Sequence, residues 1–244
     1  MSKSFLLVGG SSDIALHLGH QLMDAGHTVT LLARDIARCE ALVSAGATLV
    51  EGDALDEEAV GRAVATAVEQ GGEEGLSGVA HLVGSIALRP PHAMAVNDFS
   101  EVINTNLISA FITLKTCGKA MLKAGQGRMV FTSSVAGSYG LTNHEAIAAA
   151  KGGLESMVRS AASTYAQRGL RVNAVAPGLT ETRLGGSVLR SDAIREASVG
   201  MIPLKRINQP EEIASAMHWL LTDAPDNFTG QVLHLDGGMA NLRG

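Results

Sequence analysis

The sequence predicts an α/β fold, a doubly wound three-layer sandwich in which helices cover both faces of a parallel sheet. Short apolar runs alternate along the chain with longer segments of helical periodicity. Strands that are apolar throughout are typical of a parallel sheet buried on both faces. No linker-like segment divides the 244 residues, which is an ordinary size for one domain. We therefore expect a single domain over 1–244.

The elements follow one another in a regular order. Strands are predicted at the short apolar runs, and helices where apolar residues recur at spacings of three and four. The segment 179–209 contains glycine, serine and arginine and has no single predicted element. The predicted strands are 5–8, 28–33, 48–50, 79–83, 129–132, 171–176 and 231–235, and the predicted helices are 13–24, 35–44, 56–69, 98–123, 144–167 and 211–221.

Composition and charge argue against several classes of protein. The formal net charge is -5, and the absence of a basic run makes nucleic acid a poor candidate partner. Cys39 and Cys117 form no disulfide or metal pattern, and the eight histidines lack metal-site spacings. No apolar run resembles a signal peptide or reaches the roughly 18 residues of a membrane span. We expect a cytoplasmic protein with reduced thiols, no metal and no membrane contact.

The turn after the first predicted strand is a candidate nucleotide site. It reads Gly-Gly-Ser-Ser-Asp-Ile-Ala at 9–15 and precedes a predicted helix. Backbone N–H groups and the positive end of the helix dipole attract phosphate at such a turn. A glycine-rich turn is a weak signal by itself, and an ordinary turn in which Asp13 caps the helix is the alternative.

Four further segments carry a resemblance to a known family. They read Asn-Thr-Asn-Leu at 104–107, Phe-Thr-Ser-Ser-Val-Ala-Gly at 131–137, Arg-Val-Asn-Ala-Val-Ala-Pro-Gly at 171–178, and Thr-Gly-Gln followed by Asp-Gly-Gly within 229–238. On these motifs, which cover nearly the whole chain, the sequence resembles the single-domain short-chain dehydrogenases/reductases, similar to 3-oxoacyl-carrier-protein reductases. The resemblance implies a Rossmann-type fold with seven parallel strands. It also implies a nicotinamide-dependent oxidoreductase for a small-molecule carbonyl or hydroxyl substrate, which self-associates as a dimer or tetramer through its two long helices.

The resemblance implies four catalytic positions, and this chain departs from the family at one of them. The serine that polarises the substrate oxygen corresponds to Ser134, the lysine that holds the nicotinamide ribose to Lys151, and the asparagine that supports a water chain to Asn106. The tyrosine that exchanges the proton would stand one helical turn before the lysine, where this chain has Ile147. Hydride transfer to a carbonyl leaves an alkoxide that needs a proton donor. The active site is therefore expected to be atypical.

Three replacements for the tyrosine are open. His144 lies one turn before Ile147 on the same helical row, and imidazole exchanges protons near neutral pH; a solvated histidine at the helix start is the alternative. Tyr139 follows Ser134 on a loop expected to line the substrate pocket, although it could simply pack there. Ser134 with a water activated by Lys151 is the third route and would be slower, because water is less well positioned than a fixed donor.

The same resemblance indicates the cofactor-binding residues. Arg34 follows the second predicted strand, where an acidic residue would contact the ribose 2′-hydroxyl of NAD. Because an arginine there can pair with a 2′-phosphate, we expect NADP, with NAD less favoured; an exposed arginine at the strand end is the alternative. The expected cofactor-binding residues are Gly9, Ser11, Ser12, Ile14, Arg34, Asp53, Ala54, Gly84, Lys151, Pro177, Gly178 and Thr182.

Two further departures lie near the expected cofactor. Asp13 and Ala15 stand where the family has glycines. The Asp13 carboxylate would weaken phosphate binding unless it is turned away or caps the helix. The segment Leu82–Ser85 replaces polar residues of the family, and we expect this to remove groups that brace the sheet.

The sequence leaves three functions open. The first is an NADP-dependent reductase or dehydrogenase whose proton donor is replaced, which the retained Ser134, Lys151, Asn106 and Thr182 favour. The second is a catalytically silent nucleotide-binding or partner-binding subunit of a homo- or hetero-oligomer, which Ile147 favours. The third is an elimination or isomerisation on the same fold. In each case the segment 179–209 would cover the substrate with an apolar pocket and a basic rim.

Overall fold

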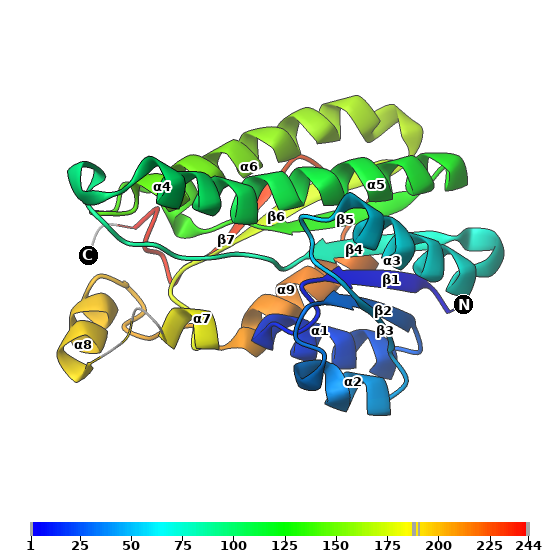
Figure 1. Cartoon of the computed structure of the whole chain (residues 1–244), viewed down its shortest axis with the longest axis horizontal. Coiled ribbons are helices and arrows are strands. Elements are labelled where there is room, and N and C mark those ends of the chain that lie inside the picture. Colours follow the sequence, from blue (N-terminus) through cyan, green and yellow to red (C-terminus); the bar gives the residue numbers. More distant parts are fainter. Residues whose placement is uncertain (1, 187–188, 190, 243–244) are drawn as a thin grey trace.

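A parallel sheet forms the middle layer of the chain (Figure 1). The computed structural model describes residues 2–186, 189 and 191–242. Within these residues the sheet has seven strands in the order β3-β2-β1-β4-β5-β6-β7, and every neighbouring pair is parallel. The predicted fold class is therefore confirmed. The strands are β1 Ser4–Val8, β2 Thr28–Ala33, β3 Thr48–Glu51, β4 Leu76–His81, β5 Gly127–Thr132, β6 Leu170–Pro177 and β7 Val232–Leu235.

Helices cover both faces of the sheet, with α1, α2 and α9 on one side and α3, α5 and α6 on the other (Figure 1). The central strand explains how both layers form. Leu6 and Val8 of β1 pack in the cluster that includes α3, α5 and α6, whereas Phe5 and Leu7 pack in the cluster that includes α1 and α9. This follows from the alternation of side chains along a strand. The helices are α1 Asp13–Asp24, α2 Glu40–Ser44, α3 Glu57–Gln70, α4 Val96–Ile103, α5 Ser109–Ala124, α6 Glu145–Tyr165, α7 Arg183–Gly186, α8 Asp192–Gly200 and α9 Pro210–Thr222.

The strand order reverses between β1 and β4, which places the ligand-binding edge of the sheet. From β1 the chain builds outward to β2 and β3, and then crosses to β4 on the other side of β1. Open α/β sheets bind ligands at such a switch point, outside the carboxyl ends of the strands. The first turn and the segments that follow β4, β5 and β6 all lie at this edge.

Three predicted boundaries are wrong. Strand β4 is Leu76–His81 rather than 79–83, because Gly78 is a strand residue: a Cβ there would lie 2.7 Å from the Phe5 ring. The predicted helix 98–123 is interrupted by a π-helical turn, Asn104–Ile108, between α4 and α5. The predicted helix 35–44 is only α2, preceded by a 3-10 turn, Ala37–Cys39.

The segment 179–209 contains the short helices α7 and α8. Its residues 187, 188 and 190 lie outside the described part of the chain. Both cysteines are buried as free thiols. None of the helices in the described ranges combines the length and the apolar character of a membrane span.

Candidate functional site

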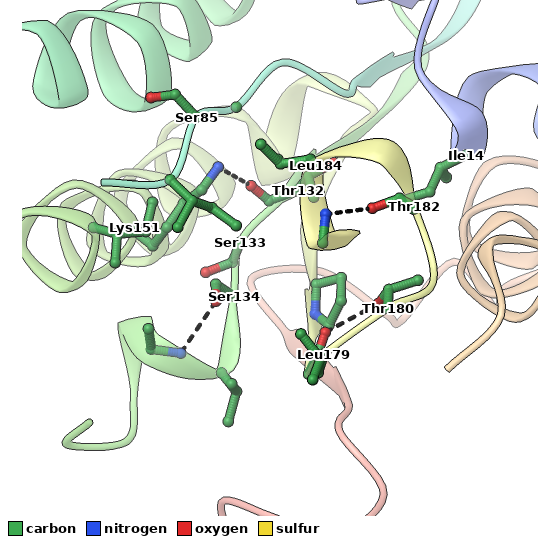
Figure 2. Close-up of a pocket in the computed structure, with 18 of the residues that line it drawn as sticks. Ile14, Ser85, Thr132, Ser133, Ser134, Lys151, Leu179, Thr180, Thr182 and Leu184 are labelled. Atoms are coloured by element: carbon green, nitrogen blue, oxygen red, sulfur yellow. Dashed lines mark hydrogen bonds between the residues drawn. The ribbon is translucent and has the colours of Figure 1, made fainter. Parts of the chain in front are cut away.

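A cavity of about 500 Å³ lies at the carboxyl edge of the sheet. Its wall includes the segments 82–86 after β4, 132–136 at the end of β5 and 177–180 at the end of β6, together with Ile147 and Lys151 of α6. Figure 2 shows Ser134 and Thr132 near the end of β5, with Lys151 reaching toward them from its helix. The fold thus brings distant motifs of the sequence to one cavity.

The first turn is shaped by Gly9, whose φ is +89°. The backbone N–H groups of Gly9 and Gly10 both donate to the carbonyl oxygen of Leu32 at 2.9 Å, which fixes the turn against β2. A Cβ on Gly9 would lie 3.0 Å from the carbonyl group of Leu82. Only glycine suits this positive φ and close approach of two chain segments.

Ser12, rather than Asp13, caps α1. The Ser12 hydroxyl oxygen accepts a hydrogen bond from the Ala15 backbone N–H at 3.1 Å. The Ala15 methyl is fully buried, so the turn accommodates the residue that replaces the family glycine.

The Asp13 carboxylate does not cap the helix, which was one of the open alternatives, and each of its oxygens has a partner. One oxygen accepts from the Arg38 guanidinium at 2.5 Å, and the other accepts from the Arg183 backbone N–H at 2.7 Å. Arg38 also donates through Nε to the Ser11 carbonyl at 2.9 Å. Asp13, Arg38 and Arg183 all line the cavity. The sequence motifs did not point to Arg38.

The expected adenine-side residues lie apart from this cavity. Arg34 donates to the Asp53 carboxylate at 3.2 Å, and its side chain is 75% exposed. The other Asp53 oxygen accepts from the Leu55 backbone N–H at 2.8 Å. Arg34, Asp53 and Ala54, like Gly9 and Ser11, are not among the lining residues, whereas Ser12, Ile14, Gly84, Pro177, Gly178 and Thr182 are.

Ser134 and Lys151 are both positioned by the end of β5. The Ser134 hydroxyl oxygen accepts from the Ala136 backbone N–H at 3.2 Å. Lys151 Nζ donates to the carbonyl oxygen of Thr132 at 2.7 Å (Figure 2). No carboxylate pairs with Lys151 among the described residues, and its side chain is buried. Burial lowers the pKa of Lys151 to about 7, because a charged ammonium is disfavoured away from water.

His81, at the end of β4, is a second buried titratable group beside this site. Its Nε2 is 2.9 Å from the Ser109 hydroxyl, and its ring contacts that of Phe131. Burial, together with the nearby positive charge of Lys151, lowers the pKa of His81 to about 3. The imidazole is therefore neutral at physiological pH. The predicted strand ended two residues later, so the sequence did not single out this position.

Asn106 is fully buried in the π-helical turn and is held by Ser85. The Asn106 amide donates to the Ser85 hydroxyl at 3.0 Å and to the Ser85 carbonyl at 3.2 Å, and its oxygen accepts from the Ser85 backbone N–H at 3.2 Å. A fourth hydrogen bond runs from the amide nitrogen to the Val102 carbonyl at 3.0 Å. Ser85 therefore braces Asn106 against the segment after β4, whereas the expected loss of groups that brace the sheet stays a prediction.

Ile147 lines the cavity at the position of the family tyrosine. It is 4% exposed and belongs to an apolar cluster with Val102, Ala136, Ala146 and Ala150. His144 also lines the cavity, and its Nδ1 is 2.7 Å from the Thr142 carbonyl. The expectation that Tyr139 lines the pocket is wrong: it is 42% exposed and is not among the lining residues.

The segment after β6 forms the cover of the cavity. Gly178 packs so closely on β7 that a Cβ would lie 2.8 Å from Asp236 Cα. The Thr182 hydroxyl accepts from the Gly185 N–H at 3.0 Å and so orders α7. The cover lines the cavity with both polar and apolar residues, and the polar ones are Thr180, Thr182, Arg183 and Ser198. Its apolar lining residues are Leu179, Leu184, Met201 and Ile202.

Comparison with known proteins agrees with this architecture. Residues 9–240 match the family described as enoyl-(acyl carrier protein) reductase. The 3-oxoacyl-[acyl-carrier-protein] reductase MabA of Mycobacterium tuberculosis is 34% identical over 241 residues, which are 98% of this chain and 93% of that protein. A variant of actinorhodin polyketide ketoreductase, solved with NADPH, has a TM-score of 0.91 at 27% identity, covering 99% of this chain and 98% of its own.

One similar protein is named as inactive. The inactive 2-(S)-hydroxypropyl-CoM dehydrogenase 2 of Xanthobacter autotrophicus is 34% identical over 225 residues, which are 89% of this chain and 97% of that protein. Sequence similarity at this level therefore extends both to proteins named as reductases and to one named as inactive.

Proposed function

This chain belongs to the short-chain dehydrogenase/reductase family, and on that premise we propose that it is an NADP-dependent oxidoreductase. Its reaction transfers a hydride between the nicotinamide and the carbonyl or hydroxyl carbon of a small molecule with an apolar body. The active site is atypical, because Ile147 replaces the proton-donating tyrosine.

One observation carries this proposal. Ser134, Lys151 and Asn106 come from different elements and are distant in the sequence, yet all three line the cavity that also touches the first turn. Each is held by specific hydrogen bonds to Ala136, Thr132 and Ser85. Burying a lysine without a counter-charge is unfavourable. Retaining it here is therefore better explained by function than by stability.

The residues at the cavity fit a dinucleotide. A Cβ on Gly84 would lie 3.1 Å from Asn106 Oδ1 and 3.8 Å from Lys151 Nζ, so a side chain here would fill space beside the lysine. Ser12 and Ile14 would hold the phosphate side of the cofactor, Lys151 the ribose, and Thr182 the nicotinamide amide. NADP is the preferred cofactor because Arg38 lies along the first turn, because Arg34 follows β2, and because the similar ketoreductase is a complex with NADPH. When bound, the nicotinamide gives or accepts the hydride.

The chain's own residues then handle the oxygen and its proton. Ser134 accepts from Ala136, so its own hydroxyl proton remains available for the substrate oxygen. Lys151 donates to Thr132, which leaves further N–H groups of the ammonium for a water or the alkoxide. With its pKa lowered to about 7, this ammonium can release a proton near neutral pH. His144, which lines the same cavity, is the second candidate donor.

A catalytically silent subunit is the alternative function. Ile147 and the relative named inactive favour it. Such a protein would bind nucleotide, or a partner, without turnover. The two functions differ in turnover and share the expectation of nucleotide binding, so they are tested in sequence.

The first experiment is a calorimetric titration of the purified protein with NADPH and with NADH. Saturable binding with tighter affinity for NADPH supports the proposed cofactor. No binding of either at millimolar concentration would contradict both an oxidoreductase and a nucleotide-binding subunit.

The second experiment follows NADPH oxidation with a panel of ketones, quinones and acyl thioesters. Turnover above background with any class supports the oxidoreductase. If NADPH binds but every substrate class stays at background, the silent subunit is the better account.

A further inference from the structure

We propose that Asp13 is an internal competitor for a phosphate group of the cofactor. Its carboxylate occupies the Arg38 guanidinium and the Arg183 backbone N–H, and cofactor binding exchanges this carboxylate for a phosphate. The inference rests on the proposed function, because it concerns the same dinucleotide site.

The contacts of Arg38 identify it as the guanidinium at the cavity. Its Nε donates to the Ser11 carbonyl and its Nη2 to the Asp13 carboxylate, so it lies along the first turn on the wall of the cavity. Arg34 is four residues earlier, but it is mostly exposed, pairs with Asp53 and is not a lining residue. Between the two arginines, Arg38 is the one that a ligand in this cavity would meet.

The Arg38 guanidinium is already paired with the Asp13 carboxylate. The Asp13 and Arg38 side chains are each 27% exposed, and the oxygen–nitrogen distance is 2.5 Å. An arginine fork suits carboxylate and phosphate alike, because both offer two oxygens in the same plane. The Asp13 carboxylate therefore binds the same Arg38 guanidinium that would bind a phosphate of the ligand.

The cover of the cavity also contacts the Asp13 carboxylate. Arg183 is the first residue of α7, and its backbone N–H donates to the second Asp13 oxygen at 2.7 Å. Its guanidinium lies 3.8 Å from the Asp35 carboxylate. Releasing Asp13 thus frees one donor beside the first turn, the Arg38 guanidinium, and one on the cover, the Arg183 N–H.

Asp35 provides a matched control. Its carboxylate is near the same arginine, Arg183, but among the described residues its one ion pair is with that exposed side chain, at the longer distance of 3.8 Å. Asp35→Asn removes the same formal charge as Asp13→Asn without releasing Arg38. A general effect of net charge would appear in both variants, whereas competition for Arg38 would appear only in Asp13→Asn.

The test is calorimetric binding of NADPH and NADH to the full chain and its variants. We expect Asp13→Asn to tighten binding by about tenfold, since it removes a like charge next to the phosphate. Asp35→Asn should change the affinity by less than about twofold, as befits an exposed charge pair. A gain confined to NADPH identifies the 2′-phosphate as the group that displaces Asp13, and an equal gain with NADH identifies the pyrophosphate.

Arg38→Gln completes the cycle. Arg38→Gln should weaken NADPH binding. Adding Asp13→Asn to Arg38→Gln should raise the affinity far less than Asp13→Asn does in the wild type, because Arg38, the partner of both anions, is gone. Thermal unfolding of each variant shows whether it is folded.

Two results would overturn the inference while leaving the proposed function intact. One is wild-type binding that Asp13→Asn leaves unchanged or weakens. The other is an equal gain in Asp13→Asn and Asp35→Asn. If neither the wild type nor Asp13→Asn binds a dinucleotide at millimolar concentration, the inference and the proposed function both fail.

Discussion

At the scale of single residues, Ile147 stands where the family has a tyrosine, so an apolar side chain takes the place of a hydroxyl group. Its side chain packs against Val102, Ala136 and Ala150 while still lining the cavity. A buried tyrosine would need a partner for its hydroxyl, whereas isoleucine needs none. The substitution is thus compatible with a well-packed wall and removes only the proton donor.

Ile147→Tyr is expected to create or raise carbonyl reduction, because Ser134, Lys151 and Asn106 remain in place around the cavity. Ile147→Phe is the control, since it adds a ring of similar size without the hydroxyl. Steady-state oxidation of NADPH with the substrate panel measures both. A folded, NADPH-binding Ile147→Tyr variant with no more activity than Ile147→Phe would contradict the proposed geometry.

Lys151→Met should stabilise the fold while abolishing function. Burial lowers the lysine pKa from 10.5 to about 7. Below pH 7 the folded state carries the full penalty of a buried charge. Between pH 7 and 10 the folded lysine is neutral while the unfolded one still binds its proton, so wild-type stability rises with pH.

The expected gain for Lys151→Met is therefore largest below pH 7, at least about 1 kcal/mol or about 2–4 °C in Tm, and shrinks toward pH 10. Thermal unfolding at pH 6 and pH 9 measures it. Lys119→Met, an exposed change on α5, should have little effect at either pH. A loss of stability in Lys151→Met at pH 6 would show that the lysine stabilises the folded state.

At the scale of elements, the π-helical turn between α4 and α5 sets the position of Asn106. The turn and the segment after β4 are joined by the hydrogen bonds between Asn106 and Ser85. Both partners lie at the cavity. The junction therefore connects the layer of α5 to the carboxyl edge of the sheet.

Ser85→Ala and Asn106→Ala should each destabilise the protein by about 1–3 kcal/mol, because buried polar groups lose their partners. Their effects should be coupled, so the double variant loses less than the sum of the two. Urea unfolding of the two single variants and the double variant measures the coupling. Additive losses would mean that the two side chains act independently.

Most elements could be predicted because apolar runs and helical periodicity record which faces are buried. The π-helical turn could not, since its residues continue the helical pattern on both sides. Helix α8 was not predicted, because the segment 179–209 was interpreted as irregular; none of its residues is buried. The start of β4 was misplaced because Gly78 was interpreted as part of a loop.

The candidate site was predictable where motifs carry it, as for Ser134, Lys151 and Asn106. Arg38 was not, because its role depends on a contact with Asp13, 25 residues away in the sequence. The hydrogen bonds of Ser85 could not be predicted for the same reason, because its partner Asn106 lies 21 residues further along the chain. Such pairs become visible only when the sheet has brought the segments together.

At the scale of the whole molecule, exposed apolar side chains gather on one stretch of the chain. Val96, Phe99, Ile108, Phe111 and Leu122 are all exposed and come from α4, the π-helical turn and α5. Ile108 and Phe111 are three residues apart and share a helix face. Clustered exposed apolar side chains often mark an interface.

Self-association through this stretch is therefore expected, as the family resemblance also implies. Phe111→Lys should shift the protein toward the monomer, and Ile36→Lys, an exposed apolar residue elsewhere, should not. Light scattering coupled to size-exclusion chromatography measures the mass. A wild-type monomer, or an oligomer unaffected by Phe111→Lys, would contradict the expectation.

The absence of buried residues in α8 has a consequence for how this protein could diversify. The cavity floor is made from strand ends of the central sheet, where substitutions disturb packing on both faces. Along α8, substitutions remove little packing and leave the stability of the sheet almost unchanged. Variant libraries directed at 192–200 should therefore keep a high fraction of folded members. Substitutions there can change substrate preference while the residues at the strand ends stay the same.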